Sequence, residues 1–396
     1  MKILLVSVGH YHDEPGGAQK IVLDEAVALR RRGNEVWVLA HGDSLQPEYE
    51  QKDEINILRY STGRVAHLNP ARWFAHQKAA TAVLARNLTK VDAIHGHIQL
   101  AYYAATQYYG DAVHSSFTVH SPAKLEMAIA WSNSSILRRL AAPVGLQMIN
   151  HIEKECLRRS HVVTALSQYT IDCIGRIHGR EYADKVRLIP GWVDTSRFVP
   201  VEDREHIKVI LGWPTDLPIL FTLRRLVPRM GLDRLLDACH RLLQEGHKFH
   251  LIIGGNGPLR GRLEEHTKTH GLSNAVTFMG RVADRELPLA YAACDTFVLP
   301  TTELECFGLI ALEALSSGRS VLATPVGAIP EIIRKIDSSW LARSAETEDI
   351  AELLRQYLTG MLPAHTPSQL HEDIYRDYDS ERVLDKFVDL ISGNLA

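Results

Sequence analysis

Short apolar stretches separated by segments of helical length recur along the chain and constrain its fold more than any other feature. The stretches 2–8, 249–253 and 320–323 are almost entirely apolar, which is typical of parallel strands covered on both faces. Segments such as 18–32 and 71–88 carry apolar residues at helical spacing. Because parallel strands need crossover connections, this alternation predicts doubly wound α/β units.

The alternation occurs in both halves of a chain of 396 residues, a length that suits two or three domains. We expect two Rossmann-like domains, 1–198 and 199–375. The linker is expected at about 197–203, where Pro200 interrupts regular structure. The amphipathic segment 379–391 predicts a final helix.

The composition indicates a soluble globular protein, with 45% hydrophobic and 23% charged residues. A net charge of −3 argues against nucleic acid as the main partner. Five cysteines without a C-x-x-C pair are typical of reduced thiols in the cytosol. The opening apolar run is too short for a signal peptide, and no run is long enough to span a bilayer. We therefore expect a cytoplasmic protein.

The stretch 299–331, LPTTELECFGLIALEALSSGRSVLATPVGAIPE, contains the main candidate site. Glu305 and Glu313 flank Gly308, and good helix formers follow the glycine. A helix beginning near Leu309 would direct its free N–H groups at an anion such as phosphate. A ligand with hydroxyls at both ends and phosphates in the middle, such as a nucleotide sugar, suits this order. An amphipathic helix with two incidental acids is the alternative.

The segments E-C-F-G-L-I-A-L-E-A, S-G-R-S-V and T-P-V-G-A-I-P-E resemble the E-x7-E signature of retaining, two-domain glycosyltransferases, often called glycosyltransferase family 4. The resemblance covers nearly the whole chain, and its specific motifs lie in the second half. It implies a GT-B fold, with two Rossmann-like domains facing a cleft and a C-terminal helix, 376–396, that packs back on the first domain.

The resemblance also implies an activity. A sugar would move from a UDP- or GDP-linked donor to a hydroxyl acceptor, with retention at the anomeric carbon. The acceptor would be a carbohydrate, a lipid-linked sugar or a small molecule, in polysaccharide, glycolipid or natural-product glycoside biosynthesis. In this assignment Glu305 binds sugar hydroxyls and Glu313 the ribose hydroxyls, and Phe307, Gly308 and Leu309 also bind the donor.

Two further segments of the second half resemble nucleotide-binding motifs. G-G-N-G-P includes Gly257, which would lie close to the nucleotide, although a turn with positive φ also explains these glycines. The strand 276–282 resembles the one whose backbone groups near Arg281 and Val282 hold the base.

The segment R-R-L-V-P-R-M-G resembles G-R-L-x-x-x-K-G, whose Arg and Lys neutralise the diphosphate. Arg225 stands at the Arg position and would be a catalytic cation. Arg224 replaces the first Gly, and Met230 stands in place of the Lys. Either the diphosphate receives one fewer charge, or Arg224 or Arg229 replaces the lysine. An inactive site and an unliganded surface cluster are the other possibilities.

In the first half, a loop with Gly16 and Gly17 follows the first strand. It lacks G-x-G-x-x-G, and the second strand ends in Ala40-His41 where a dinucleotide site has an acid, so the segment gives little support for nicotinamide binding. The resemblance implies that the two glycines approach the donor phosphates or the acceptor. A tight turn alone is the alternative.

His97 and His120 follow predicted strands, at the edge where open α/β sheets bind ligands. His120 matches the T-x-H position of the family, whose histidine reaches toward the transferred sugar. His97 is assigned to the acceptor side, with a purely structural role as the alternative. Two histidines can ligate a metal, but no carboxylate stands at ligand spacing. The one Asp-x-Asp, 377–379, is interpreted as helix-start acids, so we expect no metal and no cofactor.

The segment 123–159 reads as irregular helix. An apolar helix face beside Arg138 and Arg139 permits peripheral contact with the inner face of a membrane, while core packing with a solvated basic edge is the simpler interpretation.

No separate enzymic base is evident, and in front-face retaining transfer the departing phosphate oxygen can take the acceptor proton. A nucleotide-sugar epimerase of the same fold and a non-catalytic two-lobed sugar-binding protein are the rival functions. Coupling through nitrogen in place of oxygen is a close variant.

Overall fold

The computed structural model describes residues 1–7, 17–42, 45–62, 71–132, 136–391 and 393. The chain divides into a first unit, Met1–Gly191 together with residues from Arg382 onward, and a second unit, Trp192–Glu381. The expected linker at 197–203 therefore belongs to the second unit. Phe198 is fully buried there, and its carbonyl accepts a hydrogen bond from Ser316 Oγ at 2.6 Å.

The first unit contains a sheet whose strand order, among the described residues, is β3-β4-β2-β1-β5-β6-β7-β8. β3 pairs antiparallel with β4, and the other pairs are parallel. The elements are β1 Lys2–Val6, α1 Gly17–Arg31, β2 Glu35–His41, β3 Tyr49–Lys52, β4 Ile55–Tyr60, α2 Ala71–Asn87, β5 Ala93–Gly96, α3 Gln99–Tyr109, β6 His114–Val119, α4 Ala123–Ser132, α5 Ile136–Arg159, β7 Val162–Ala165, α6 Gln168–His178, α7 Arg180–Ala183 and β8 Val186–Leu188, with α16 Ser380–Ile391 joining from the chain's end.

The central strand β1 has the burial that its sequence predicts. Ile3, Leu4, Leu5 and Val6 are fully buried. β3 was not predicted, because Y-E-Q-K is polar and mostly exposed. A polar edge strand forms by backbone pairing alone and leaves no apolar pattern in the sequence.

The ligand-binding edge of the first sheet follows from its topology. β5 pairs with β1, and the chain continues from β1 toward β2 on one side and from β5 toward β6 on the other. In such sheets the carboxyl ends of the two diverging strands form the usual binding crevice. Residues directly after β1 and β5 are therefore the best-placed candidates in this unit.

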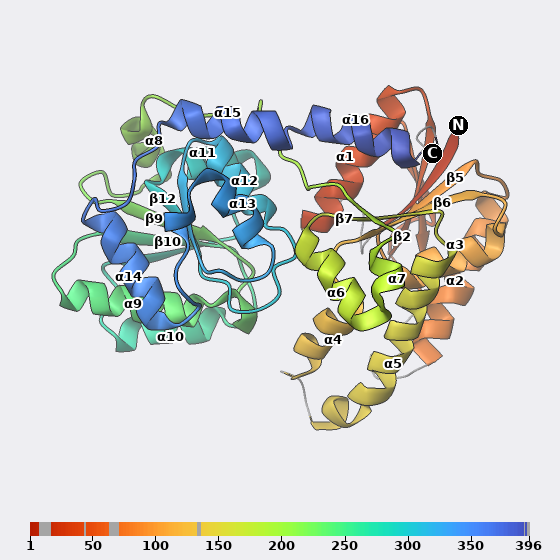
Figure 1. The fold of residues 1–396 in the computed structure, drawn as a ribbon, viewed down its shortest axis with the longest axis horizontal. Helices are drawn as coiled ribbons and strands as arrows, with labels where there is room; N and C mark the ends of the chain where they lie inside the picture. The colour runs from red at the N-terminus through yellow and green to blue at the C-terminus, as the bar shows by residue number, and fades with distance from the viewer. Residues whose placement is uncertain (8–16, 43–44, 63–70, 133–135, 392, 394–396) are drawn as a thin grey trace. The chain divides into compact units, whose positions relative to one another are not determined.

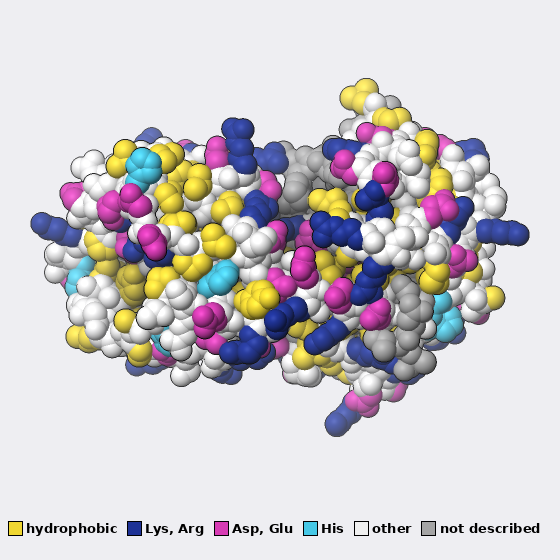
Figure 2. Space-filling model, turned by 90° about the horizontal axis from the view of Figure 1, so that it is seen from above, with side chains coloured by type: hydrophobic (Ala, Val, Ile, Leu, Met, Phe, Trp, Pro, Cys, Tyr) yellow, Lys and Arg dark blue, Asp and Glu magenta, His cyan; other side chains and the backbone are white. Residues whose placement is uncertain are grey.

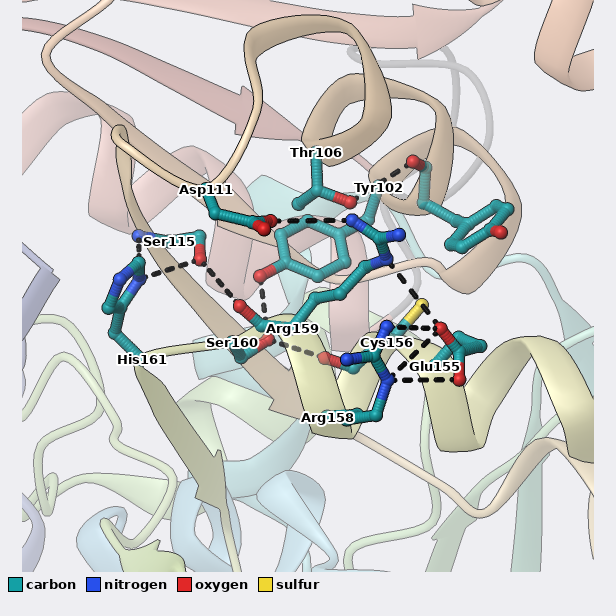
Figure 3. Close-up of polar contacts among 11 residues, drawn as sticks. Tyr102, Thr106, Asp111, Ser115, Glu155, Cys156, Arg158, Arg159, Ser160 and His161 are labelled. Atoms are coloured by element: carbon teal, nitrogen blue, oxygen red, sulfur yellow. Dashed lines mark hydrogen bonds and ion pairs between the residues drawn. The ribbon is translucent and has the colours of Figure 1, made fainter.

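The C-terminal end of α5 is tied to α3 and β6 by polar contacts, drawn in Figure 3. Tyr102 Oη and Ser160 Oγ are 2.6 Å apart, and Ser160 Oγ donates to the Cys156 carbonyl at 2.7 Å. Ser115 Oγ lies 3.0 Å from His161 Nδ1. These contacts lie away from the carboxyl ends of the strands, at the start of β6, so they stabilise the unit without forming part of a ligand site.

The second unit has a five-stranded parallel sheet in the order β11-β10-β9-β12-β13. Figure 1 shows α9, α10 and α14 on one side of this sheet and α11 and α12 on the other. The elements are α8 Arg204–Leu211, β9 Ile219–Leu223, α9 Leu232–Gln244, β10 His250–Gly254, α10 Arg260–Thr269, β11 Val276–Gly280, α11 Leu287–Ala293, β12 Thr296–Leu299, α12 Leu309–Ser316, β13 Ser320–Ala323, α13 Ile329–Ile336, α14 Thr347–Leu358 and α15 Pro367–Tyr378, with 3₁₀ turns at Pro228–Met230, Asp284–Glu286 and Ser338–Trp340. β9 and β12 are neighbours, and the chain continues from β9 toward β10 on one side of this pair and from β12 toward β13 on the other. The strand connections therefore diverge at the β9–β12 pair.

The end of the chain forms two helices where one was expected. α15 ends at Tyr378, so Asp377 lies in its last turn, where it pairs with Arg376 at 3.0 Å. Interpreting Asp377 as a helix-start acid was therefore wrong. Asp379 does precede α16 and accepts the Glu381 backbone N–H at 3.1 Å.

α16 packs into the first unit. Its Asp385 and Asp389 each lie 2.6 Å from the Arg32 guanidinium, and Phe387 meets the His95 ring edge-on at 5.2 Å. All of the residues expected on its apolar side are buried, namely Val383, Leu384, Phe387, Val388, Leu390 and Ile391.

No helix within the described ranges is long and apolar enough to cross a membrane. On the face drawn in Figure 2, basic and acidic side chains are mixed, and neither sign forms a broad patch. Arg138 and Arg139 lie in α5, but their side chains are outside the described part of the structure.

Candidate active site

A buried ion pair lies where the strands of the second sheet diverge. Arg224 directly follows β9, and Glu305 lies in the loop after β12. Arg224 Nη2 donates to Glu305 Oε2 at 2.7 Å. The Arg224 side chain is 2% exposed and that of Glu305 is 18% exposed. The Glu305 carboxylate therefore reaches solvent, whereas the Arg224 guanidinium that bonds to it is buried.

Arg224 also occupies the space beside Met230. Its Nη2 and Nε lie 2.6 and 3.2 Å from Met230 Sδ, and Nη2 donates to Thr301 Oγ1 at 2.9 Å. Arg224, at the position of the first glycine of the family's motif, thus lies next to Met230, which stands in place of the lysine. This contact indicates how a positive charge is retained in the site.

The other two arginines of the segment are arranged differently. Arg225 is exposed. Arg229 Nη1 donates to the Leu304 carbonyl at 2.6 Å, which ties the 3₁₀ turn Pro228–Met230 to the loop that carries Glu305. The structure therefore brings Arg224 and Arg229 to the glutamate loop, and leaves Arg225 facing solvent.

The loop around Glu305 is held by close backbone contacts. The Glu305 carbonyl accepts the Ala328 N–H at 2.7 Å. A Cβ atom at Gly327, whose φ is +63°, would lie 2.0 Å from the Glu305 carbonyl oxygen. Only glycine fits so close an approach. Leu304 has a φ of 46°, a conformation that costs a non-glycine residue about 1–3 kcal/mol and is often found at functional sites.

α12 begins as the sequence predicts. Gly308, with φ +95°, precedes the helix, and Leu309 is its first residue. The first N–H groups of a helix have no acceptor within it, so this end can receive an anion. Phe307 is buried, with its ring centroid 6.2 Å from that of Tyr378. Glu313 is buried in the second turn and accepts the Tyr291 hydroxyl at 2.9 Å.

Tyr291 is a functional candidate that sequence reasoning missed. It is fully buried on α11, and burial together with the Glu313 carboxylate raises the pKa of its hydroxyl well above the usual range. The hydroxyl is therefore a hydrogen-bond donor that orients Glu313. Thr301, beside Arg224, was missed in the same way. Nothing in the local sequence marks either residue, since both contacts join segments distant in the chain.

The remaining residues assigned to the donor lie at the ends of strands. Gly257 follows β10, and its N–H donates to Asn256 Oδ1 at 2.8 Å. Arg281 is exposed and Val282 buried, directly after β11. All three therefore lie at the carboxyl edge of the second sheet.

In the first unit, His97 and His120 lie together at the carboxyl ends of β5 and β6. His97 Nδ1 and His120 Nε2 are 2.8 Å apart, and His97 Nε2 lies 2.8 Å from Glu25 Oε2. Burial lowers the pKa of His97 to about 3. Gly17 is the exposed first residue of α1, whereas Gly16 lies outside the described residues. Glu25 was not identified from sequence, because it falls between apolar residues of an ordinary amphipathic helix.

Two groups among the described residues bring three potential metal-ligand atoms within 4.8 Å of one another: Glu25, His95 and His97, and Asp237, His266 and His270. In the first group His95 already hydrogen-bonds through both ring nitrogens, to Ser116 Oγ at 2.7 Å and Thr118 Oγ1 at 3.1 Å. In the second, His266 Nε2 is 2.8 Å from Asp237 Oδ1. Hydrogen bonds thus engage His95 and His266, whereas neither carboxyl oxygen of Glu25 has a regular hydrogen bond among the described residues.

Two Rossmann-like units, with an anion-receptive helix and a cation–carboxylate pair where the second sheet diverges, define a protein of the GT-B class. A model described as "Glycosyl transferases group 1" matches residues 203–373, and one described as "Glycosyltransferase Family 4" matches residues 15–197. Together these models account for most of both units. The chain belongs to this family of glycosyltransferases.

Curated relatives include a GDP-mannose-dependent alpha-(1-6)-phosphatidylinositol monomannoside mannosyltransferase of Mycobacterium tuberculosis, 30% identical over 54% of this chain and 58% of that protein. The match thus spans little more than half of that relative's length. A D-inositol 3-phosphate glycosyltransferase of Actinosynnema mirum is 26% identical over 86% of this chain and 83% of that protein.

Solved structures share the fold. Sucrose-phosphate synthase from Thermosynechococcus elongatus has a TM-score of 0.81 at 21% identity, covering 98% of each chain. Anabaena HepE in complex with UDP and glucose has a TM-score of 0.75 at 19% identity, covering 99% of this chain and 100% of that one. At these identities the likeness establishes the fold, while chemistry has to be argued from the residues.

Proposed function

We propose that this protein transfers a hexose from a nucleotide-diphosphate sugar to an acceptor hydroxyl. The observation that carries the proposal is the Arg224–Glu305 pair where β9 and β12 diverge. A carboxylate there accepts hydrogen bonds from sugar hydroxyls, and the buried guanidinium beside it holds that carboxylate in place and adds positive charge near a bound diphosphate. A nucleotide sugar carries sugar hydroxyls and phosphate groups in one molecule.

The nucleotide would extend along the carboxyl edge of the second sheet. Glu313, oriented by the Tyr291 hydroxyl, accepts the ribose hydroxyls, and backbone groups near Arg281 and Val282 hold the base. The diphosphate lies over the start of α12, where the partial charge of the helix and nearby guanidinium groups stabilise it. Arg224 supplies the charge that the lysine supplies elsewhere in the family, and Arg225 reaches the diphosphate from solvent.

Leaving-group stabilisation is then the main catalytic effect. As the glycosidic C–O bond breaks, negative charge grows on the diphosphate, and fixed cations and N–H groups stabilise that charge more in the transition state than in the ground state. Family membership supports retention at the anomeric carbon and a metal-independent reaction. His120 orients the sugar, and His97 lies on the acceptor side.

The acceptor class is proposed from the relatives. By their names, these relatives include a phosphatidylinositol monomannoside mannosyltransferase, a D-inositol 3-phosphate glycosyltransferase and a 2-deoxystreptamine glucosyltransferase of Streptomyces kanamyceticus. We place this chain's acceptor among such glycolipid or small glycoside hydroxyl compounds, in the cytoplasm or at the inner membrane face. A GDP- or UDP-linked hexose is the proposed donor.

The test is turnover of UDP- and GDP-hexoses with a panel of inositol, glycolipid and glycoside acceptors, read by nucleoside diphosphate release and by NMR of the product. Acceptor-dependent release with the donor's anomeric configuration, unchanged by chelator, is the expected result. Conversion of donor to an isomer without acceptor would identify an epimerase, and binding without any turnover would identify a sugar-binding protein.

A further inference from the structure

An aspartate and three histidines lie together on α9 and α10 of the second unit. The two helices cover the same side of the second sheet (Figure 1). Asp237 and His240 are three residues apart on α9, and both are partly exposed. His266 and His270 are four residues apart at the end of α10, and both are also partly exposed. Residues at these spacings share one face of a helix.

The side chains of this cluster pack closely against one another. His266 Nε2 lies 2.8 Å from Asp237 Oδ1. The rings of His266 and His270 stack, with their centroids 4.2 Å apart and an angle of 15° between their planes. The His240 ring meets the His270 ring edge-on at 5.1 Å. One potential ligand atom each of Asp237, His266 and His270 lies within 4.8 Å of the other two.

Backbone carbonyl groups fix the tautomers of two of these histidines. His270 Nδ1 lies 2.9 Å from the His266 carbonyl oxygen, and His240 Nδ1 lies 2.9 Å from the His270 carbonyl oxygen. A carbonyl oxygen can only accept, so in the neutral rings Nδ1 carries the proton and Nε2 keeps a lone pair. Metal-binding histidines usually have this arrangement, in which the second ring nitrogen donates to a fixed acceptor and orients the ring.

Asp237 supplies a negative charge beside the imidazoles. Its side chain is 41% exposed, and among the described residues it forms an ion pair with His266 and with no lysine or arginine. The His266 side chain is 22% exposed, so solvent reaches both groups. A metal ion that replaced the proton between Asp237 and His266 would gain a carboxylate oxygen and an imidazole nitrogen at once.

We propose that Asp237, His266 and His270 bind Zn²⁺, with water in the remaining position. Two imidazoles, a carboxylate and a water form one of the tetrahedral sets that Zn²⁺ adopts. Its ligand atoms then lie roughly 3.3 Å apart, a separation that rotation of these partly exposed side chains can reach. On binding, the His266 Nε2 proton leaves to solvent.

The ion fastens α9 to α10 and stabilises the second unit, because Asp237 comes from one helix and the two histidines from the end of the other. None of the three residues belongs to the candidate donor site. Glycosyl transfer therefore needs no Zn²⁺, and the metal site goes beyond the proposed function without depending on it.

The test is titration calorimetry of the full chain with Zn²⁺, after treatment with a chelator and its removal. We expect saturable binding of one Zn²⁺ at this cluster. At a free Zn²⁺ concentration of about 100 times Kd, the Tm should rise by roughly 5–10 °C. Bound Co²⁺ should show the visible absorption of a four-coordinate site with nitrogen and oxygen ligands.

Asp237→Asn is the most informative variant, because asparagine still accepts the His266 hydrogen bond but is a much poorer ligand for Zn²⁺. Asp237→Asn and His270→Ala should each weaken Zn²⁺ binding by at least the roughly 10–100-fold that is typical of a lost outer-shell partner. His206→Ala is the matched control. His206 is an exposed histidine of α8 outside both groups of potential ligands, so this variant should bind Zn²⁺ as the wild type does.

Two results would overturn the proposal. One is the absence of Zn²⁺ binding by the wild type. The other is wild-type affinity in folded Asp237→Asn and His270→Ala proteins, which would identify adventitious binding elsewhere on the chain. Circular dichroism and the Tm of the metal-free proteins verify folding. Since Zn²⁺ binding is measured without donor or acceptor, failure of the metal site is distinguishable from failure of the proposed function.

Discussion

Introducing a lysine at Met230 tests how the second unit compensates the diphosphate charge. From sequence alone, Met230→Lys would restore a missing cation and tighten diphosphate binding. In the structure Arg224 already contacts Met230 Sδ at 2.6 Å. The added ammonium would therefore meet a buried guanidinium, so we expect weaker stability and no gain in diphosphate affinity.

The magnitude follows from the spacing. Two like charges about 4 Å apart at an effective dielectric constant of about 20 repel by about 4 kcal/mol. Glu305 lies 2.7 Å from Arg224 and offsets part of this, and the lysine stem can bend toward solvent. We expect a net destabilisation of about 1–3 kcal/mol, which lowers Tm by roughly 2–4 °C per kcal/mol for a unit of this size.

A double-mutant cycle isolates the cause. Arg224→Gly combined with Met230→Lys restores the family's Gly and Lys and should recover most of the stability and of the affinity for UDP or GDP, a coupling of about 1–3 kcal/mol. Met361→Lys, at an exposed methionine, controls for added charge. Calorimetric titration and thermal unfolding provide the readouts. Additive effects in the cycle, or tighter diphosphate binding by Met230→Lys alone, would refute the reasoning.

Two further predictions concern buried polar groups. Tyr291→Phe removes the hydrogen bond to Glu313 and should lower the free energy of unfolding by about 1–3 kcal/mol. In titrations it should weaken the binding of nucleotides more than the binding of free sugar. Nucleotide affinity equal to that of the wild type would count against a ribose role for Glu313. Because the folded-state pKa of His97 lies near 3, below its unfolded value, the unfolded state binds more protons, so this residue's contribution to stability is lost as pH falls from about 6.5 toward 3. His97→Gln should therefore flatten the dependence of Tm on pH in that window, and an unchanged slope would contradict the assignment.

The sequence predicts most of the regular structure because it is encoded in local patterns. Strand β13 and helix α11 have the bounds expected from apolar runs and helix formers. The interdomain boundary was misplaced, since Pro200 marks an irregular segment but cannot show that Phe198 is buried in the second unit.

Part of the candidate site was predicted because it too is encoded in a local sequence pattern. Glu305, Gly308 and Glu313 are adjacent in sequence, and their spacing indicates a loop entering a helix. The identity of the buried cation needed the fold, because Arg224 and Glu305 meet only where β9 and β12 pair. Glu25 likewise becomes a candidate functional residue only once α1 places it beside His97.

The most direct test of the central claim is nucleotide-sugar binding by wild type and by Glu305→Ala, measured as thermal stabilisation across UDP- and GDP-hexoses. The account predicts that at least one donor raises the Tm of wild type and that Glu305→Ala loses much of the shift. It also predicts that the free nucleoside diphosphate still stabilises both proteins. No stabilisation of wild type by any donor, or an equal shift in the variant, would contradict the assignment of Glu305 to the donor sugar.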